Sequence, residues 1–221
     1  MDNKKIKGVL LDMDGTLFDT ETASIFSWGV AAREFGLDID LDFMLGCIGL
    51  PTQDIARRFY DRFGDDLDYN AFREYKLNVM ADIIKHYGPS LKKGARELLE
   101  YIKSEGLRCA LATSTTYRRA TYNLEAGGIL EAFDVVITSE MIKNGKPSPD
   151  PYILAAGRLG LTPFDCAVIE DSENGILSAA ASGAVSILVP DIILNERMTK
   201  TADYQCESLL DVIDIIKEIN S

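Results

Sequence analysis

The chain has 221 residues, of which 47% are hydrophobic, and a formal net charge of −12 at pH 7. This length and composition are typical of a soluble globular protein with one large domain, or with a core domain that carries a smaller inserted one. A protein that binds the phosphate backbone of nucleic acids needs a basic surface, and this chain has a negative net charge. We therefore expect no nucleic acid partner. No apolar run approaches the length of a bilayer crossing, so we expect no membrane partner.

The cysteines indicate a reducing environment. Cys47, Cys109, Cys166 and Cys206 lie far apart, and no two of them form a Cys-x-x-Cys pair. We interpret all four as reduced, partly buried thiols. The first apolar run is too short for a signal peptide and soon meets acidic residues. We therefore expect a cytoplasmic protein, and we take a monomer as the expected state.

The first informative stretch is Val-Leu-Leu-Asp-Met-Asp-Gly-Thr-Leu at residues 9–17. Its apolar start predicts a buried strand that ends in Asp12 and Asp14. If extended geometry persists, residues two apart share a face, and Gly15 then allows a sharp turn. Adjacent carboxylates repel each other and either raise a pKa or recruit a hard cation such as Mg²⁺. The alternative is a solvated turn rich in Asp.

The next region predicts an all-helical unit without strands. Apolar residues recur at helical spacing, and glycines end the runs, at residues 24–35, 53–63 and 70–87. We expect Trp28 and the other aromatic residues here to pack in a core rather than hold a cofactor. We expect His86 to be exposed at the end of its helix, where it contacts helix carbonyls. The sequence Gly-Leu-Pro at 49–51 is a turn signal.

From residue 89 onward, helical and strand patterns alternate. Strand patterns occur at residues 109–112, 135–137, 167–169 and 185–189, and helical patterns at 95–102, 117–126, 150–159, 173–183 and 208–219. This alternation predicts an α/β fold in which a doubly wound parallel sheet has helices on both faces. Ligands of such sheets bind at the carboxyl ends of the strands.

Polar side chains follow the predicted strands at this edge. The residues concerned are Asp12, Asp14, Thr113, Ser114, Lys146, Glu170 and Asp171. Carboxylate, hydroxyl and ammonium groups at one edge suit phosphoryl transfer through an aspartyl-phosphate. In this chemistry a carboxylate attacks phosphorus while cations neutralise the phosphoryl oxygens. A second acid then protonates the leaving oxygen and later activates water.

These motifs, taken as an ordered set, resemble the haloacid dehalogenase-like superfamily in its β-phosphoglucomutase-like phosphatase branch. The first motif of that family is matched by Asp12-Met-Asp14-Gly-Thr16-Leu, and the others by Thr113, Lys146-Pro-Ser-Pro-Asp150-Pro and Glu170-Asp171-Ser-Glu-Asn-Gly175. The resemblance implies a Rossmann-like catalytic core from residues 1–17 and 89–221. It also implies a helical cap from residues 18–88.

The resemblance assigns the metal and the two carboxylate roles. Asp12 would be the nucleophile and an Mg²⁺ ligand, and Asp14 would be the general acid/base and bind Mg²⁺ through its carbonyl oxygen. Asp171 would be a further ligand, and Glu170 would bind Mg²⁺ directly or through water.

The resemblance also assigns the groups that hold phosphate. Thr113 and the Ser114 N–H would bind the transferring phosphoryl group, and Lys146 would pair with it and with Asp12. The substrate implied is a small phosphorylated metabolite.

The sequence leaves hydrolase and mutase as alternatives. In β-phosphoglucomutase, a histidine, an arginine and a lysine stand where this chain has Ser24, Thr52 and Thr116. The arginine and the lysine hold the second phosphate of the substrate. Because none of the three residues here is basic, we favour hydrolysis of a monophosphate ester over a mutase reaction. A phospho-accepting signalling module and a non-catalytic binding protein are further alternatives, and motif order disfavours the first.

Overall fold

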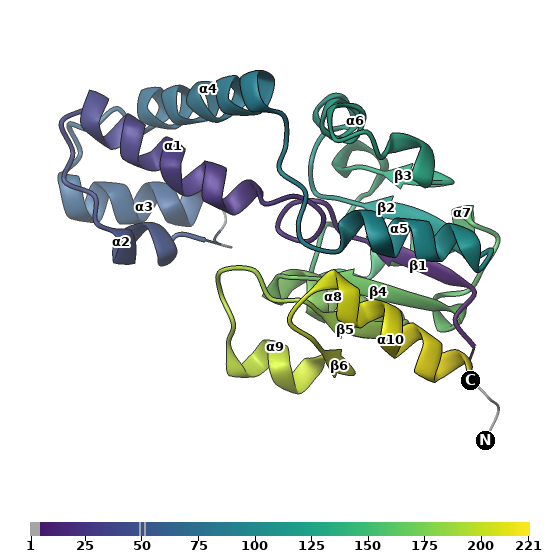
Figure 1. Ribbon diagram of the computed structural model, residues 1–221. Coiled ribbons are helices and arrows are strands. Elements are labelled where there is room, and N and C mark those ends of the chain that lie inside the picture. The colour runs from purple at the N-terminus through teal and green to yellow at the C-terminus, as the bar shows by residue number, and fades with distance from the viewer. Residues whose placement is uncertain (1–4, 49, 51) are drawn as a thin grey trace. The chain divides into compact units, whose positions relative to one another are not determined.

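The computed structural model describes residues 5–48, 50 and 52–221. The chain divides into two compact units, one formed by Met1–Asp19 with Pro89–Ser221 and the other by Thr20–Gly88. The first unit contains a sheet with helices, and the described part of the second contains helices (Figure 1). We describe each unit by itself. Gly49 and Pro51, which belong to the predicted turn, lie outside the described residues.

The α/β unit is built on a sheet of six parallel strands in the order β3-β2-β1-β4-β5-β6. The two strands at its centre are short, wholly buried apolar runs, as expected where helices cover both faces. The strands are β1 (Gly8–Leu11), β2 (Arg108–Ala112), β3 (Val135–Ile137), β4 (Cys166–Glu170), β5 (Val185–Leu188) and β6 (Tyr204–Gln205).

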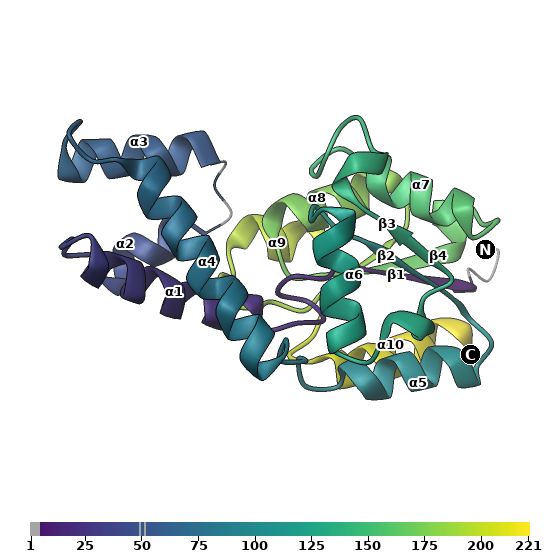
Figure 2. The ribbon, with the colours of Figure 1, turned by 90° about the horizontal axis from the view of Figure 1, so that it is seen from above.

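Two hydrophobic cores flank the sheet because strand side chains alternate between its faces. Val9 and Leu11 belong to one core and Leu10 to the other. Figure 2 shows α5 and α10 on one side of the sheet and α7 on the other. The predicted doubly wound α/β fold is confirmed. The first core takes residues from α5 (Ala95–Ser104), α6 (Tyr117–Ala126) and α10 (Leu209–Asn220), and the second from α7 (Asp150–Arg158) and α8 (Glu173–Ser182).

Several short elements carry too few residues to show a periodic pattern in the sequence. They are α2 (Leu41–Leu45), α9 (Glu196–Thr201), β6 and the 3₁₀ turns η1 (Leu130–Ala132), η2 (Ser139–Met141) and η3 (Pro163–Asp165). In the part of the chain that the structure describes, no helix combines the length and the apolar character needed to cross a bilayer.

The helical unit comprises α1 (Thr20–Glu34), α2, α3 (Thr52–Phe63) and α4 (Tyr69–Tyr87). Its core is a cluster of aromatic rings around the fully buried Phe59. The ring of Phe59 lies 4.8 Å from that of Phe72 and 5.3 Å from that of Trp28. The prediction that these aromatic residues form a packed core is confirmed.

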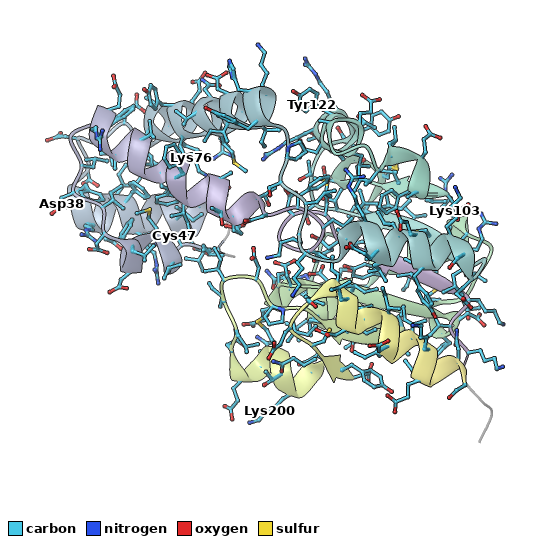
Figure 3. All side chains as sticks on the ribbon, viewed as in Figure 1. Asp38, Cys47, Lys76, Lys103, Tyr122 and Lys200 are labelled. Atoms are coloured by element: carbon cyan, nitrogen blue, oxygen red, sulfur yellow. The ribbon has the colours of Figure 1, made fainter. Side chains whose placement is uncertain are left out.

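Polar contacts complete the helical unit. The ammonium of Lys76 on α4 lies between α4 and α1 (Figure 3), where it donates to Ser24 Oγ at 2.8 Å. His86 is exposed, and its Nδ1 lies 2.8 Å from the carbonyl oxygen of Asp82, as expected for its place on the helix. Cys47 is buried in this unit, and all four cysteines are free thiols, as predicted.

The segments that lead into and out of the helical unit hydrogen-bond to each other. The N–H of Asp19 donates to the carbonyl of Ser90 at 2.9 Å, and the N–H of Lys92 donates to that of Leu17 at 2.8 Å. The two ends of the inserted chain are therefore held side by side.

Replacing Phe59 with Ala is expected to lower the free energy of unfolding of the helical unit by about 3–5 kcal/mol, because a fully buried ring leaves a cavity. Trp28 is the only tryptophan of the chain, so its fluorescence during urea unfolding reports on this cluster. The matched control is Phe26→Ala on α1, where the side chain is 62% exposed and the expected change is within about 0.5 kcal/mol. Equal losses for the two variants would contradict the central role of Phe59.

Candidate active site

Three carboxylates meet at the carboxyl ends of the two central strands. Asp12 directly follows β1, Glu170 is the last residue of β4, and Asp171 follows Glu170. The strands are parallel neighbours with Leu11 opposite Ile169, so Asp12 and Glu170 reach the same level at one edge of the sheet. An oxygen from each of the three carboxylates lies within 4.8 Å of the other two. The sheet thus gathers three hard oxygen ligands from segments far apart in the sequence.

The ammonium of Lys146 reaches into this cluster from the loop before α7. It forms ion pairs with both Asp12 and Glu170, and the distance to Glu170 Oε1 is 2.6 Å. The Lys146 side chain is only 7% exposed. The ring centroid of Tyr152 lies 5.1 Å from its Nζ. The peptide bond between Lys146 and Pro147 is cis.

Glu170 is held by hydrogen bonds on both of its oxygens. Oε1 accepts from Lys146 and from the hydroxyl of Tyr152, both at 2.6 Å. Oε2 accepts from Ser172 Oγ at 3.0 Å and from the backbone N–H groups of Asp171 and Ser172 at 3.1 and 3.3 Å. A carboxylate offers about four lone-pair positions. These hydrogen bonds fix the Glu170 side chain and favour its charged form.

The pKa values of the cluster follow from burial and from its charges. Burial raises the pKa of Asp12 to about 7, against the opposing charge of Lys146. Burial and the charges of Glu170 and Asp12 raise the pKa of Asp171 well above its usual range. Burial acts in the same direction on Glu170, but the charge and hydrogen bond of Lys146 outweigh it and hold the Glu170 pKa below its usual value.

Lys146 keeps its positive charge because of the two carboxylates beside it. Burial alone would lower the pKa of the ammonium, but the charges of Asp12 and Glu170 outweigh burial and hold the Lys146 pKa well above its usual value. A buried lysine that stays protonated is a fixed positive charge beside two carboxylates.

Asp14, Thr113 and Thr115 form a second group beside the cluster. β1 ends at Leu11, and Asp14 forms an isolated bridge with Phe18 just before the turn at residues 15–17. Its carboxylate is not among the three described above. Its Oδ2 accepts instead from Thr115 Oγ1 at 2.8 Å. Thr113 is buried, and its Oγ1 accepts from the Thr115 N–H at 3.0 Å. Ser114 lies between these two threonines and is exposed.

Two glycines allow the backbone to approach the carboxylates. A Cβ on Gly15, where φ is +85°, would lie 2.7 Å from Asp171 Cγ. A Cβ on Gly175, in the first turn of α8, would overlap the carboxyl group of Glu170. Both positions therefore need glycine for reasons of space, and Gly15 also needs it for its backbone conformation.

Sequence reasoning missed four side chains that hold the predicted ones in place. Thr16 Oγ1 donates to Asp171 Oδ1 at 2.7 Å, while Tyr152 and Ser172 donate to Glu170. Thr115 completes the set through Asp14. Thr16 and Ser172 each had a signal in the sequence, since they stand within the first and last of the matched motifs. The sequence carries no signal for Tyr152, because an aromatic residue on an apolar helix face is expected to belong to the hydrophobic core.

The donor set fits a divalent cation. Asp12, Glu170 and Asp171 bring three potential negative charges, against the one positive charge that Lys146 supplies. Carboxylate oxygens are the ligands that Mg²⁺ prefers, and a divalent ion would balance the charge of the group. The described residues thus form a site suited to Mg²⁺ by both chemistry and charge.

Gly175→Ala is expected to lower the free energy of unfolding by about 1–3 kcal/mol, because the added methyl group must displace the buried Glu170. The control is Gly157→Ala, in the last turn of α7, where nothing lies within 4 Å of an added Cβ. That change is expected to raise the free energy by about 0.5–1 kcal/mol. Urea denaturation followed by circular dichroism measures both, and a stabilising Gly175→Ala would contradict the packing described.

Comparison with known proteins identifies relatives over nearly the whole chain. A phosphorylated carbohydrates phosphatase of Thermotoga maritima is 32% identical over 220 residues, which cover 97% of this chain and 100% of that protein. Fructose-1-phosphate phosphatase YqaB of Escherichia coli is 31% identical and covers 81% of this chain and 94% of its own length.

A solved structure is also similar to this chain over nearly its whole length. CbbY from Rhodobacter sphaeroides, in complex with phosphate, has a TM-score of 0.76 at 25% identity and covers 94% of this chain and 96% of its own. The family model described as haloacid dehalogenase-like hydrolase matches residues 9–189. The predicted resemblance is confirmed, and the chain belongs to the haloacid dehalogenase-like hydrolase family.

Proposed function

We propose that this protein is an Mg²⁺-dependent phosphatase that hydrolyses a small phosphate monoester, a sugar phosphate or a similar metabolite, through an aspartyl-phosphate on Asp12. The observation that carries the proposal is the buried ion-pair cluster in which Lys146 bonds both Asp12 and Glu170. A carboxylate beside a fixed ammonium can attack phosphorus while that ammonium stabilises the charge on the phosphoryl oxygens.

In the first step, an oxygen of Asp12 attacks phosphorus and the bond from phosphorus to the leaving oxygen breaks. Asp14 gives its proton to that leaving oxygen, which departs as an alcohol. The Thr113 hydroxyl and the Ser114 N–H hold the remaining phosphoryl oxygens, together with Lys146. Thr113 is suited to this task because its hydroxyl lies at the carboxyl end of β2, one strand from Asp12.

In the second step, water attacks the phosphoryl group and the bond from phosphorus to Asp12 breaks. Asp14, now ionised, accepts the proton of the water, so the same side chain serves both halves of the reaction. Asp12 is released as a carboxylate beside Lys146.

Asp12, Asp171 and the carbonyl oxygen of Asp14 would hold Mg²⁺, and Glu170 would bind it directly or through water. When bound, the ion supplies positive charge beside the transferring phosphoryl group. Lys146 bonds Glu170 throughout and keeps that carboxylate ionised. Residues 18–88 would serve as the cap that this family inserts after its first motif, and residues 1–17 and 89–221 would form the catalytic core.

The substrate class is proposed from the relatives. Two similar proteins are a phosphatase for phosphorylated carbohydrates and a fructose-1-phosphate phosphatase. A phosphorylated sugar or polyol is therefore the first class to test. The absence of a basic residue at Ser24, Thr52 and Thr116 favours a monophosphate over a bisphosphate substrate.

Asp12→Asn is expected to reduce phosphate release at least about 10³-fold, because the amide cannot act as the nucleophile. The measurement is release of inorganic phosphate from a panel of sugar and polyol phosphates, with Mg²⁺ and after its removal with EDTA. Chelation is expected to abolish release, and added Mg²⁺ to restore it. Asp214→Asn on the exposed face of α10 is the control and should retain full activity.

Two outcomes would contradict the phosphatase proposal. One is full activity of the Asp12→Asn variant. The other is the conversion of glucose 1-phosphate to glucose 6-phosphate with a bisphosphate primer and without net release of phosphate, which would instead establish a mutase.

Asp171→Asn is expected to have opposite effects on metal binding and on stability. Asp171 lies beside Asp12 and Glu170, which both pair with the one ammonium of Lys146, so an uncharged side chain here relieves repulsion and raises the melting temperature of the metal-free protein. Its Oδ1 still accepts from Thr16. The same change removes a ligand charge and weakens Mg²⁺ binding at least about tenfold.

Thermal unfolding in EDTA and in a series of Mg²⁺ concentrations measures both effects. Asp214→Asn serves again as the matched control, with no change in Mg²⁺ response. An Asp171→Asn variant stabilised by Mg²⁺ as strongly as the wild-type protein would contradict the metal site.

A further inference from the structure

The two oxygens of the Asp14 carboxylate lie in different surroundings. Oδ2 accepts a hydrogen bond of 2.8 Å from Thr115 Oγ1. Oδ1 is buried and has no hydrogen-bond partner among the residues that the structure describes. Since a buried polar atom without a partner is costly, an arrangement that leaves one oxygen free calls for an explanation.

The turn after β2 fixes the position of Thr115. Its N–H donates to Thr113 Oγ1 at 3.0 Å, and its carbonyl accepts from the N–H of Ser139 at 3.2 Å. Thr113 is in turn tied to the sheet, because its N–H donates to the carbonyl of Ile137 at 3.0 Å. The hydroxyl of Thr115 is therefore presented to Asp14 from an anchored segment.

We infer that Thr115 is a positioning residue for the proton transfers of Asp14, an inference that rests on the proposed phosphatase function. A hydroxyl that donates to Oδ2 disfavours a proton on that oxygen, so the proton is carried by Oδ1. When Asp14 is ionised, the same hydrogen bond holds the carboxylate in the same orientation. Thr115 thus leaves Oδ1 as the oxygen that exchanges its proton with the substrate.

The proton follows the two steps of the reaction. As the bond from phosphorus to the leaving oxygen breaks, the proton on Oδ1 passes to that oxygen and the alcohol departs. As water later attacks phosphorus and the bond to Asp12 breaks, a proton of the water returns to Oδ1. Thr115 loses no proton in either step, so it orients the acid without being consumed by the chemistry.

The test compares Thr115→Val, which removes the hydroxyl at nearly constant volume, with Thr115→Ser, which keeps it. Thr199→Val is the matched control, because Thr199 is exposed on α9 and its hydroxyl donates to the carbonyl of Glu196 in the same helix. Each variant is assayed with p-nitrophenyl phosphate, whose leaving group departs without a proton, and with fructose 1-phosphate, whose leaving alkoxide needs one. The ratio kcat/KM reports the steps up to departure of the leaving group.

Thr115→Val is expected to lower kcat/KM for fructose 1-phosphate about 10- to 100-fold, a part of what a general acid contributes, and to change that for p-nitrophenyl phosphate less than about threefold. The loss should lie in kcat rather than in KM, and Thr115→Ser should restore most of it. In an Asp14→Asn background, Thr115→Val should have no further effect.

Equal losses on both esters would overturn the inference, because they indicate general damage to the site. An unchanged Thr115→Val variant, or a Thr115→Ser variant as impaired as Thr115→Val, would overturn it too. Trp28 fluorescence and circular dichroism verify that each variant is folded. If the wild-type protein shows no Asp12-dependent hydrolysis of either ester, the proposed function itself is wrong, and so is the role inferred for Thr115.

Discussion

The site depends on a buried ammonium shared between two carboxylates. Lys146 bonds Asp12 and Glu170 where all three side chains are nearly removed from water. Such a group is stable only when hydrogen bonds satisfy the remaining oxygens, because removing charges from water costs several kcal/mol per ion. Tyr152 and Ser172 provide those hydrogen bonds to Glu170. Much of the local sequence around the cluster can be understood as support for this one ionic contact.

The groups with different tasks are held in different ways. The proposed nucleophile, Asp12, directly follows a central strand and is paired with a charged, buried partner. The proposed acid, Asp14, lies just before a turn and is held by a neutral hydroxyl that forms a single hydrogen bond to it. A nucleophile benefits from a fixed position and a fixed charge, whereas an acid must change its charge twice in each cycle. A neutral partner accommodates that change better than an ion pair does.

The sequence was sufficient to predict a parallel sheet with five of its six strands, the longer helices between them, and the meeting of Asp12, Lys146, Glu170 and Asp171 at one edge. These features depend on periodic apolar runs and on the rule that polar residues follow the carboxyl ends of parallel strands. The hydrogen bonds of Thr115 and Tyr152 could not be predicted, since both link segments whose separation in space is set by packing. The short strand β6 and helix α9 were missed because elements of so few residues show no periodic pattern of apolar side chains.

The paired segments at the ends of the helical unit also bear on how this protein could have been assembled. The N–H of Asp19 donates to the carbonyl of Ser90 and that of Lys92 to the carbonyl of Leu17, so the inserted residues begin and end at adjacent points of the α/β unit. An insert whose ends meet can be removed, exchanged or lengthened without pulling the surrounding strands apart. The same sheet and ion cluster could accept inserts of different size, and the helical unit could be replaced by a short turn to obtain a minimal core.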